Sequence, residues 1–142
     1  MSTQVDVRRI VHTLPHVLER DDCFGFDIVI GAKKLGFVWL WRERVDPKKA
    51  RVPNPDVLAL RVPDLDAKEA MLMSDQGSFF TEPHYDGYAA VLVRLKSLRG
   101  AELRVLLKNV HAALVEKMTR KNARADTIEN ERVKERAVRN RR

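Results

Sequence analysis

The sequence predicts an α+β domain, a compact two-layer fold in which an antiparallel sheet of about four or more strands packs against an N-terminal and a C-terminal helix. Apolar residues recur at helical spacing near the start of the chain and again after residue 100. Between them lie several apolar runs of strand length, separated by segments that contain glycine and proline. The chain has 142 residues, which is the size of one domain.

Three helices are expected. The first begins at Thr3, which can form a cap with Asp6, and ends before Pro15, which cannot continue a helix. Its apolar residues share one face: Val7, Ile10, Val11 and Leu14. A short second helix starts at a cap formed by Asp66. The third starts after Gly100 and has the strongest apolar stripe: Leu103, Leu106, Leu107, Val110 and Leu114.

Four strands are predicted between the first and last helices. Residues 24–30 alternate between apolar and smaller or polar side chains, and residues 31–34 form a turn. Residues 37–41 are apolar on both faces, as in a central strand, so these two strands form a hairpin. Residues 57–62 and 88–95 are the third and fourth strands.

Residues 42–55 are expected to form a long loop, the arm, because three prolines exclude a helix interior or a central strand. Its cations outnumber its two acids by three. These cations are Arg42, Arg44, Lys48, Lys49 and Arg51. An extended segment stiffened by proline loses little entropy when it docks along phosphates. The alternative is a solvated loop without a ligand.

The charge is distributed unevenly along the chain, whose formal net charge is +7. Residues 1–118 hold 18 Lys and Arg against 16 Asp and Glu, whereas residues 119–142 hold nine against four. The second segment has too few apolar residues to bury a core, so we expect the domain to end at residue 118. A basic tail follows, either a helical extension or disordered. Arg120, Lys121 and Arg124 are its candidate contacts with a polyanion, and a functionless solvated end is the alternative.

No catalytic residue, metal site or cofactor is predicted. His12 and His16 have the spacing of a metal clamp, but Pro15 interrupts the helix that would align them. Residues 31–36 have the two glycines of a phosphate loop without its lysine and hydroxyl. The His-Tyr-Asp sequence at residues 84–86 is not a triad, because adjacent side chains diverge. We therefore expect a protein without enzymatic activity.

Two further features bear on setting and function. Cys23 is the one cysteine, which excludes an internal disulfide, and no signal peptide is recognisable at the N-terminus, so we expect a cytoplasmic protein. The longest apolar run is too short to cross a membrane. Trp39 and Trp41 lie in that run and are expected to be packing residues, with base stacking as the alternative.

Two segments resemble a known family. Residues 79–95, with the sequence FFTEPHYDGYAAVLVRL, resemble the hallmark of the MmcQ/YjbR-like family, and so does the arm from Glu43 to Pro53. With the first and last helices in place, the resemblance covers about residues 3–118. Glu82 and Ala89 depart from the pattern, which usually has threonine or proline at the first position and often proline at the second.

The resemblance implies a compact α+β domain similar to proteins described as having a double-wing DNA-binding arrangement. It brings no catalytic residues. The positions it carries over are Thr81, Pro83, His84, Tyr85, Gly87 and Arg94, with Lys48, Lys49 and Arg51 of the arm.

The resulting expectation is a DNA-binding protein that contacts phosphates through the arm and the tail, with low sequence specificity. Two alternatives remain open. One is a module that binds a small molecule or phosphate around His84, Tyr85 and Arg94, and the other is a protein-interaction adaptor that uses the sheet. The sequence leaves the oligomeric state open.

Overall fold

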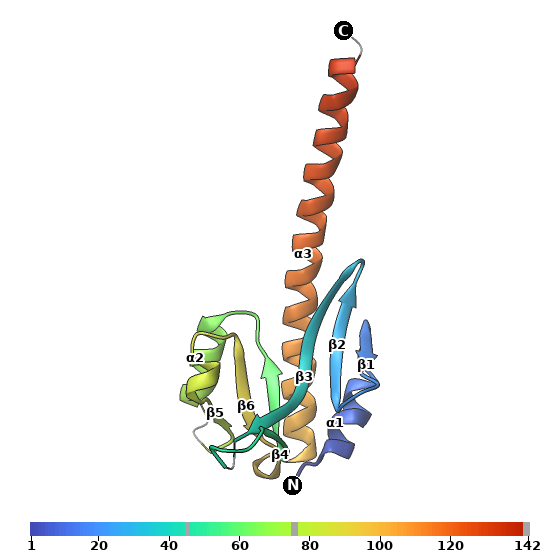
Figure 1. Ribbon diagram of the computed structural model, residues 1–142. Helices are drawn as coiled ribbons and strands as arrows, with labels where there is room; N and C mark the ends of the chain where they lie inside the picture. Colours follow the sequence, from blue (N-terminus) through green and yellow to red (C-terminus); the bar gives the residue numbers. More distant parts are fainter. Residues whose placement is uncertain (45, 75–76, 141–142) are drawn as a thin grey trace.

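The computed structural model describes residues 1–44, 46–74 and 77–140, without the side chains of residues 126 and 138–140. The chain has the predicted α+β fold, a six-stranded antiparallel sheet with helices at both ends of the sequence (Figure 1). The strands follow the order β1 (Val17–Glu19), β2 (Gly25–Ile30), β3 (Lys33–Glu43), β4 (Val52–Arg61), β6 (Ala90–Arg94) and β5 (Phe79–Phe80).

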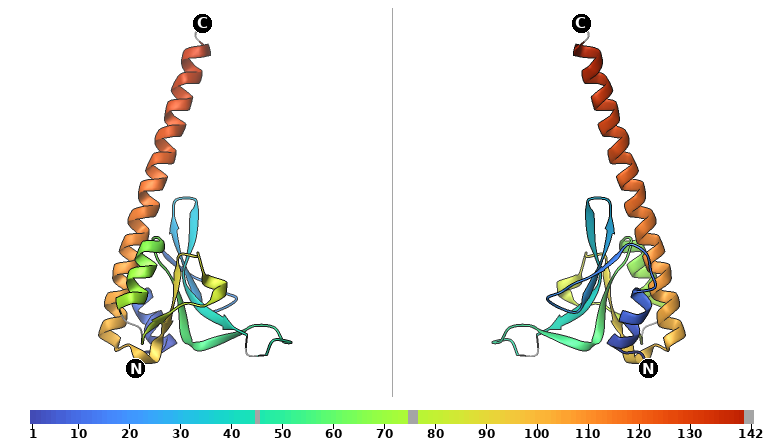
Figure 2. Two further views of the ribbon diagram at one scale, coloured as in Figure 1. Left: turned by 90° about the vertical axis from the view of Figure 1, so that its left-hand side faces the viewer. Right: turned by 90° about the vertical axis from the view of Figure 1, so that its right-hand side faces the viewer.

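Three α-helices cover one face of this sheet, and the opposite face carries none of them (Figure 2). They are α1 (Gln4–Val11), α2 (Leu65–Ser74) and α3 (Gly100–Asn140). We call the opposite side the open face. Its side chains come from alternate strand positions: Asp27, Trp39, Trp41, Val57, Ala59, Arg61, Phe80, Leu92 and Arg94. Two short 3₁₀ turns, η1 (Pro83–Tyr85) and η2 (Leu95–Ser97), flank β6.

The hydrophobic core lies between the sheet and the helices. Most of the predicted stripes of the first and third helices are buried there: Val7, Ile10 and Val11 of α1 and Leu103, Leu107, Val110 and Leu114 of α3. Leu106 is partly buried, and so is Leu14, which lies outside the helix because α1 ends at Val11 and not at Pro15. They pack on the sheet residues Phe26, Ile28, Phe37, Leu58, Leu60, Val91 and Val93. His111 is the one polar side chain of α3 buried here among the residues described, and its Nε2 lies 2.7 Å from the carbonyl oxygen of Pro15.

The caps of the first two helices differ in how well the sequence predicts them. At α1, the backbone N–H of Thr3 donates to Asp6 Oδ2 at 2.9 Å, so the predicted pairing is confirmed. At α2, the prediction of Asp66 as the cap is wrong. The backbone N–H of Ala67 donates to Asp64 Oδ1 at 2.8 Å, and the helix begins at Leu65. Asp64 lies two positions before the expected cap and three residues after the end of β4.

The arm is largely the far end of the β3–β4 hairpin. Arg42 pairs with Pro53 and Glu43 with Val52, so β3 and β4 are longer than predicted. The expectation of a loop is wrong for residues 52–55, which belong to β4. Only Val57–Arg61 of that strand pair with β6, so its first residues have a neighbour on one side alone. A proline is tolerated there because no partner needs its missing N–H.

Two strands were not predicted from the sequence because they are very short. β1 has three residues and β5 has two, and both lie at the edges of the sheet. The strand predicted over residues 88–95 is shorter than expected, from Ala90 to Arg94. Such short edge strands are defined by pairing with the neighbouring strand, because two or three residues cannot show a periodicity in the sequence.

Helix α3 continues far beyond the sheet (Figure 1). Met118 is its last core residue, 7 % exposed, and the side chains that follow are mostly exposed up to residue 137. The tail was expected to be either a helical extension or disordered, and the structure shows the helical extension. The 41 residues of α3 span about 60 Å at 1.5 Å per residue.

Candidate nucleic-acid interface

An aromatic cluster occupies the middle of the open face. Trp39 and Trp41 of β3, Phe80 of β5 and Tyr85 of η1 surround a small apolar floor. That floor consists of Val57, Ala59 and Leu92. The tryptophans are packing residues, as expected, but they are half-buried on the open face and do not belong to the core under the helices.

A bulge in β3 explains why both tryptophans face this way. Phe26 pairs with Val38 and Asp27 with Gly36, so Phe37 has no partner in β2. The extra residue allows Phe37 and Val38, although adjacent, to be buried in the core under the helices. Trp39 and Trp41 follow at alternate positions, and both lie in the cluster of the open face.

The rings of the cluster contact one another through their edges. Trp39 Nε1 donates to the hydroxyl oxygen of Tyr85 at 3.3 Å. Trp41 and Phe80 meet at nearly a right angle, with their centroids 5.6 Å apart. Edge contacts leave ring faces free for other partners.

Arginine side chains take up several of these ring faces. Cζ of Arg94 lies 3.9 Å from the ring centre of Phe80, and Cζ of Arg61 lies 5.1 Å from that of Tyr88. Arg61 and Arg20 also lie over Trp39, at 5.8 and 6.0 Å. A guanidinium plane can stack on an aromatic ring and still donate hydrogen bonds at its edge.

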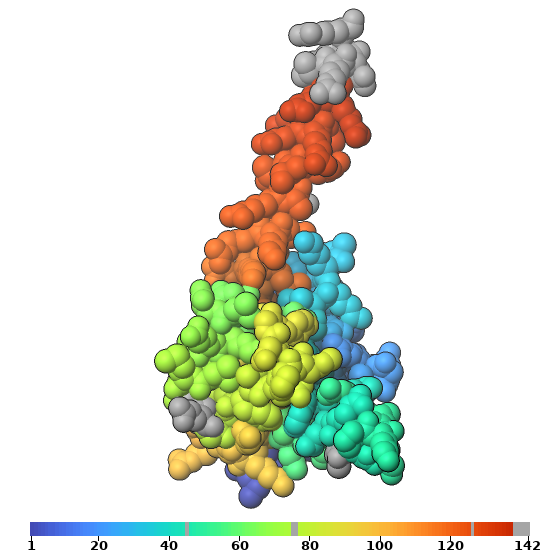
Figure 3. All heavy atoms as spheres, turned by 60° about the vertical axis from the view of Figure 1, so that its left-hand side comes forward, coloured from blue at the N-terminus to red at the C-terminus, as the bar shows by residue number. Residues whose placement is uncertain are grey.

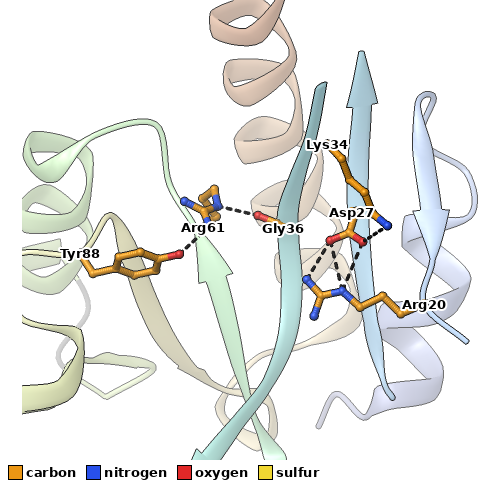
Figure 4. Close-up of polar contacts among 6 residues, drawn as sticks. All are labelled: Arg20, Asp27, Lys34, Gly36, Arg61 and Tyr88. Carbon is orange, nitrogen blue, oxygen red and sulfur yellow. Dashed lines mark hydrogen bonds and ion pairs between the residues drawn. The ribbon is translucent and has the colours of Figure 1, made fainter. Parts of the chain in front are cut away.

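These arginines differ in how their charge is balanced (Figure 4). Arg20 donates to both carboxylate oxygens of the buried Asp27, at 2.8 to 3.3 Å, and this bond raises the pKa of Arg20 above its usual value. Arg61 donates from Nε to the carbonyl oxygen of Gly36 at 2.6 Å and from Nη2 to the hydroxyl of Tyr88 at 2.5 Å. In the described part of the chain, neither Arg61 nor Arg94 has a carboxylate within 4.0 Å. The open face therefore keeps two uncompensated positive charges.

The segment that resembles the family hallmark folds over one margin of this face. Lys68 of α2 donates from Nζ to the carbonyl oxygens of Tyr85 and Tyr88, at 2.6 and 2.9 Å. Its side chain is buried, and desolvation lowers the pKa of Lys68, with the charge of Asp86 acting in the opposite direction. Gly87 has a φ of +74°, which supports the predicted turn. Nothing in the sequence pattern distinguished Lys68 from a surface lysine.

The six hallmark positions do not form one pocket. Tyr85 belongs to the aromatic cluster, and Arg94 reaches the same face through Phe80. His84 is exposed, touches Tyr85 with a centroid distance of 5.8 Å, and shares no described interaction with Arg94. Thr81 is half-buried, and its Oγ1 has no hydrogen-bond partner among the residues described.

The arm projects from the sheet on the side away from the helices (Figure 2). Asp46 organises its tip, because its Oδ1 accepts from the backbone N–H of Lys48 at 2.9 Å and its carbonyl oxygen accepts from that of Lys49 at 3.0 Å. The side chains of Lys48 and Lys49 are exposed, and none of the described carboxylates lies within 4.0 Å of them. The tip therefore presents two free ammonium groups.

Two of the three arm arginines, Arg44 and Arg51, have their guanidinium groups engaged within the protein. Arg44 Nη1 donates to the carbonyl oxygen of Pro47 at 3.2 Å. Arg51 Nη1 donates to the carbonyl oxygen of Arg42 at 3.2 Å and lies 3.9 Å from Glu82 Oε1. Arg42 lines a small pocket of about 110 Å³ together with Arg20 and Trp39. Arg51 and Glu82 thus join the arm to the hallmark segment. These two segments lie side by side on the molecular surface (Figure 3).

The tail cations lie on the other side of the molecule. Arg120 forms an exposed ion pair with Glu116 at 3.3 Å, and it lines a hollow of about 330 Å³ together with Lys121, Arg124 and Asp64. Figure 2 shows α3 on one side of the sheet and the arm on the other. The structure does not bring the arm and the tail cations onto a common surface.

Within residues 1–44, 46–74 and 77–140, no group of three or more His, Cys, Asp or Glu side chains could hold a metal ion. None of the helices described is long and apolar enough to cross a membrane.

Three known proteins are similar to this chain. They are the uncharacterized proteins Mb2600 of Mycobacterium bovis and MT2646 and Rv2570 of Mycobacterium tuberculosis. Each is 35% identical over 115 residues, covering 75% of this chain and 84% of the relative. No family model matches the chain. No solved structure matches it either.

Proposed function

We infer the function from the chain's own surface, because it belongs to the family of the mycobacterial proteins Mb2600, MT2646 and Rv2570, whose descriptions give no activity. We propose that it is a DNA-binding protein without enzymatic activity, which contacts phosphates through the arm and has low sequence specificity. The resemblance to the MmcQ/YjbR-like family supports the same proposal.

The tip of the arm is the observation that carries this proposal. Lys48 and Lys49 are exposed at the end of a projecting hairpin, and the acid beside them, Asp46, accepts hydrogen bonds from their backbone and not from their side chains. A phosphate can therefore pair with either ammonium group without breaking an existing ion pair. Such pairing releases counterions from DNA and is the main source of nonspecific affinity.

The arrangement of the helices supports low specificity. Sequence is read by side chains of a helix or ribbon that make bidentate contacts with base edges in the major groove. Helices α1 and α2 and the part of α3 that packs on the core lie on the side of the sheet away from the arm (Figure 2). The ribbon that leads an approach by the arm presents Lys48 and Lys49 at its tip, and lysine is a point charge that suits phosphates better than bidentate base contacts.

The tail provides a second, separate contact. Lys121 and Arg124 are exposed on α3, and Arg120 is held only by an exposed ion pair, which contributes little stability. Because these cations are on the other side of the sheet, the arm and the tail would engage different stretches of DNA or different molecules.

A protein-interaction role is the second candidate. An apolar groove of about 650 Å³ between α2 and α3 is lined by Met71, Phe79, Val105, Leu106 and Val110. Val105 is 58 % exposed. This groove favours a protein contact on the helical side, whereas the earlier expectation placed it on the sheet. It is independent of the arm, so both roles are compatible.

The test is a titration of a labelled DNA duplex at several salt concentrations with the full chain and with the double variant Lys48→Glu, Lys49→Glu. If both ammonium groups contact phosphates, the slope of log K against log salt should become shallower by about 1.8, at about 0.9 per phosphate. The control is Lys33→Glu, Lys108→Glu, which makes the same charge change at two exposed lysines, one at the end of β3 opposite the arm and one on α3.

Binding by the control should stay within about threefold of wild type, since screened charges at a distance act weakly. Equal losses in both double variants would show that only net charge matters and would overturn the arm as the contact surface. Absence of binding by the wild-type chain at low salt would overturn the proposed function.

A further inference from the structure

We propose that the open face binds single-stranded DNA, with unpaired bases on its aromatic cluster and phosphates at Arg61, Arg94 and the arm. This inference rests on the proposed function, because the arm supplies part of the phosphate contact. It goes further by naming the form of DNA and the surface that receives the bases.

The first step is the concentration of aromatic rings on an uncovered sheet. The chain has nine aromatic residues, and five of them lie on or beside the open face. They are Trp39, Trp41, Phe80, Tyr85 and Tyr88. None of the three α-helices covers this side. Rings on an open sheet are platforms on which successive bases of a single strand stack, and every base has a face that can take part.

The second step is the charge beside the rings. Arg94 is exposed and stacks on Phe80, and Arg61 stacks on Tyr88, which is 41 % exposed. No described carboxylate within 4.0 Å neutralises either guanidinium. A planar guanidinium can stack on a base and can also donate to phosphate oxygens. Phosphate pairing at these two sites therefore brings the adjoining bases to the stacked guanidinium planes and to the ring faces that these leave uncovered.

The third step is the shape of the margins. The arm and the hallmark segment are joined by Arg51 and Glu82, and the two segments lie side by side on the surface (Figure 3). Because the hallmark segment contributes Phe80 and Tyr85 to the cluster, we call this pair of segments the rim of the open face. Lys68 fixes the hallmark segment through two carbonyl oxygens, so the rim is held in place from behind the sheet. A single strand can lie inside such a rim, whereas a duplex keeps its bases paired inside and offers the rings only its backbone.

The experiment uses the two tryptophans as probes, because both lie in the aromatic cluster and the chain has no others. The full chain is titrated with a twelve-nucleotide oligo(dT), with an abasic strand of the same length and with a twelve-base-pair duplex. Oligo(dT) should quench the tryptophan fluorescence and bind at least about tenfold more tightly than the abasic strand, since each stacked base contributes about fivefold or more and several bases stack. The duplex should leave the fluorescence unchanged.

Two variants locate the contact. Arg94→Gln removes an exposed charge while keeping a similar length, and Tyr88→Leu removes an exposed ring. Each should weaken oligo(dT) binding at least about fivefold while duplex binding changes less than twofold. Lys108→Gln, an exposed charge change on α3, is the control and should leave both unchanged. If Tyr88→Leu disturbs folding, Arg94→Gln still tests the surface.

The outcomes separate this inference from the proposed function. Duplex binding with no preference for oligo(dT) over the abasic strand, and no quenching, overturns the inference and leaves the proposed function standing. Quenching by oligo(dT) without duplex binding supports the inference and overturns contact with duplex DNA. A twelve-nucleotide oligo(U) that binds more tightly than oligo(dT) overturns the assignment to DNA. No binding of any strand overturns both.

Discussion

The ammonium group of Lys68, on helix α2, lies 2.6 Å from the carbonyl oxygen of Tyr85, whose ring belongs to the aromatic cluster of the open face. A second bond at 2.9 Å reaches the carbonyl oxygen of Tyr88. Lys68 is 6 % exposed, so helix α2 anchors the hallmark segment with a buried cation and two backbone acceptors. One side chain on the helical side therefore positions the rim of the open face.

Replacing Lys68 with methionine should destabilise the domain by about 1 to 3 kcal/mol, because it removes two hydrogen bonds from a buried ammonium group to partly buried carbonyl oxygens, each of which keeps one backbone N–H donor. Urea unfolding of the wild type and of Lys68→Met measures this difference. Lys96→Met is the matched control, since Lys96 makes only an exposed ion pair with Asp56 at 3.3 Å and should cost less than about 0.5 kcal/mol. Equal stability of the two variants would contradict the anchoring role.

Gly87 should tolerate no side chain without strain. Its φ is +74°, and a Cβ there would meet no atom within 4 Å, so the cost of Gly87→Val is conformational and should be about 1 to 2 kcal/mol. Gly100→Ala is the control, because Gly100 also has open space but no positive φ. Thermal unfolding should show a lower Tm for Gly87→Val and an unchanged or higher Tm for Gly100→Ala.

Met118 should mark the end of the energetically important part of α3. Met118→Ala is expected to cost about 2 kcal/mol, because the side chain is 7 % exposed and packs on the core. Ile128→Ala should change the free energy of unfolding by less than about 0.5 kcal/mol, since Ile128 is 50 % exposed on the free part of the helix.

By the same reasoning, a chain that ends at residue 118 should still unfold cooperatively, and loss of that transition would show that the fold needs the extension.

Glu19 should titrate below the ordinary carboxyl pKa of 4.5. Arg8 Nε donates to Glu19 Oε1 at 2.6 Å, and this bond is the largest cause that lowers the pKa of Glu19. A lowered pKa in the folded state means that the pair stabilises the fold above the unfolded-state pKa and that this contribution is lost as the pH falls through the folded-state pKa. An NMR titration of the Glu19 carboxyl checks the shift. Arg8→Met should raise the midpoint, and Arg104→Met should not.

The sequence predicted the elements whose burial is periodic and local. The stripe from Leu103 to Leu114 and the alternation around Ile28 arise from spacing along the chain alone, and the structure buries both against the same core. The strands β1 and β5 have too few residues for a period, so only their neighbours determine them. Pro53 was misjudged because its tolerance depends on where β6 stops pairing, which is a property of the sheet.

The candidate site was predicted only in part for the same reason. The arm lysines could be identified from local charge. The roles of Lys68, Arg61 and Arg20 depend on partners between 7 and 27 positions away, including Asp27, Gly36, Tyr85 and Tyr88. A local pattern contains no record of such partners, so these three cations looked like ordinary surface residues.

The length of α3 has a consequence for how the molecule tumbles. A compact body with a straight rod of about 60 Å rotates more slowly about its short axes than about its long one. Because the N–H bonds of a helix lie along its axis, those of α3 are reoriented only by the slow rotations. Amides whose bonds lie across the rod also sample the fast one. Backbone ¹⁵N relaxation should therefore give α3 a longer apparent correlation time than differently oriented amides of the body, and a bend in the helix would appear as a step in that value along its sequence.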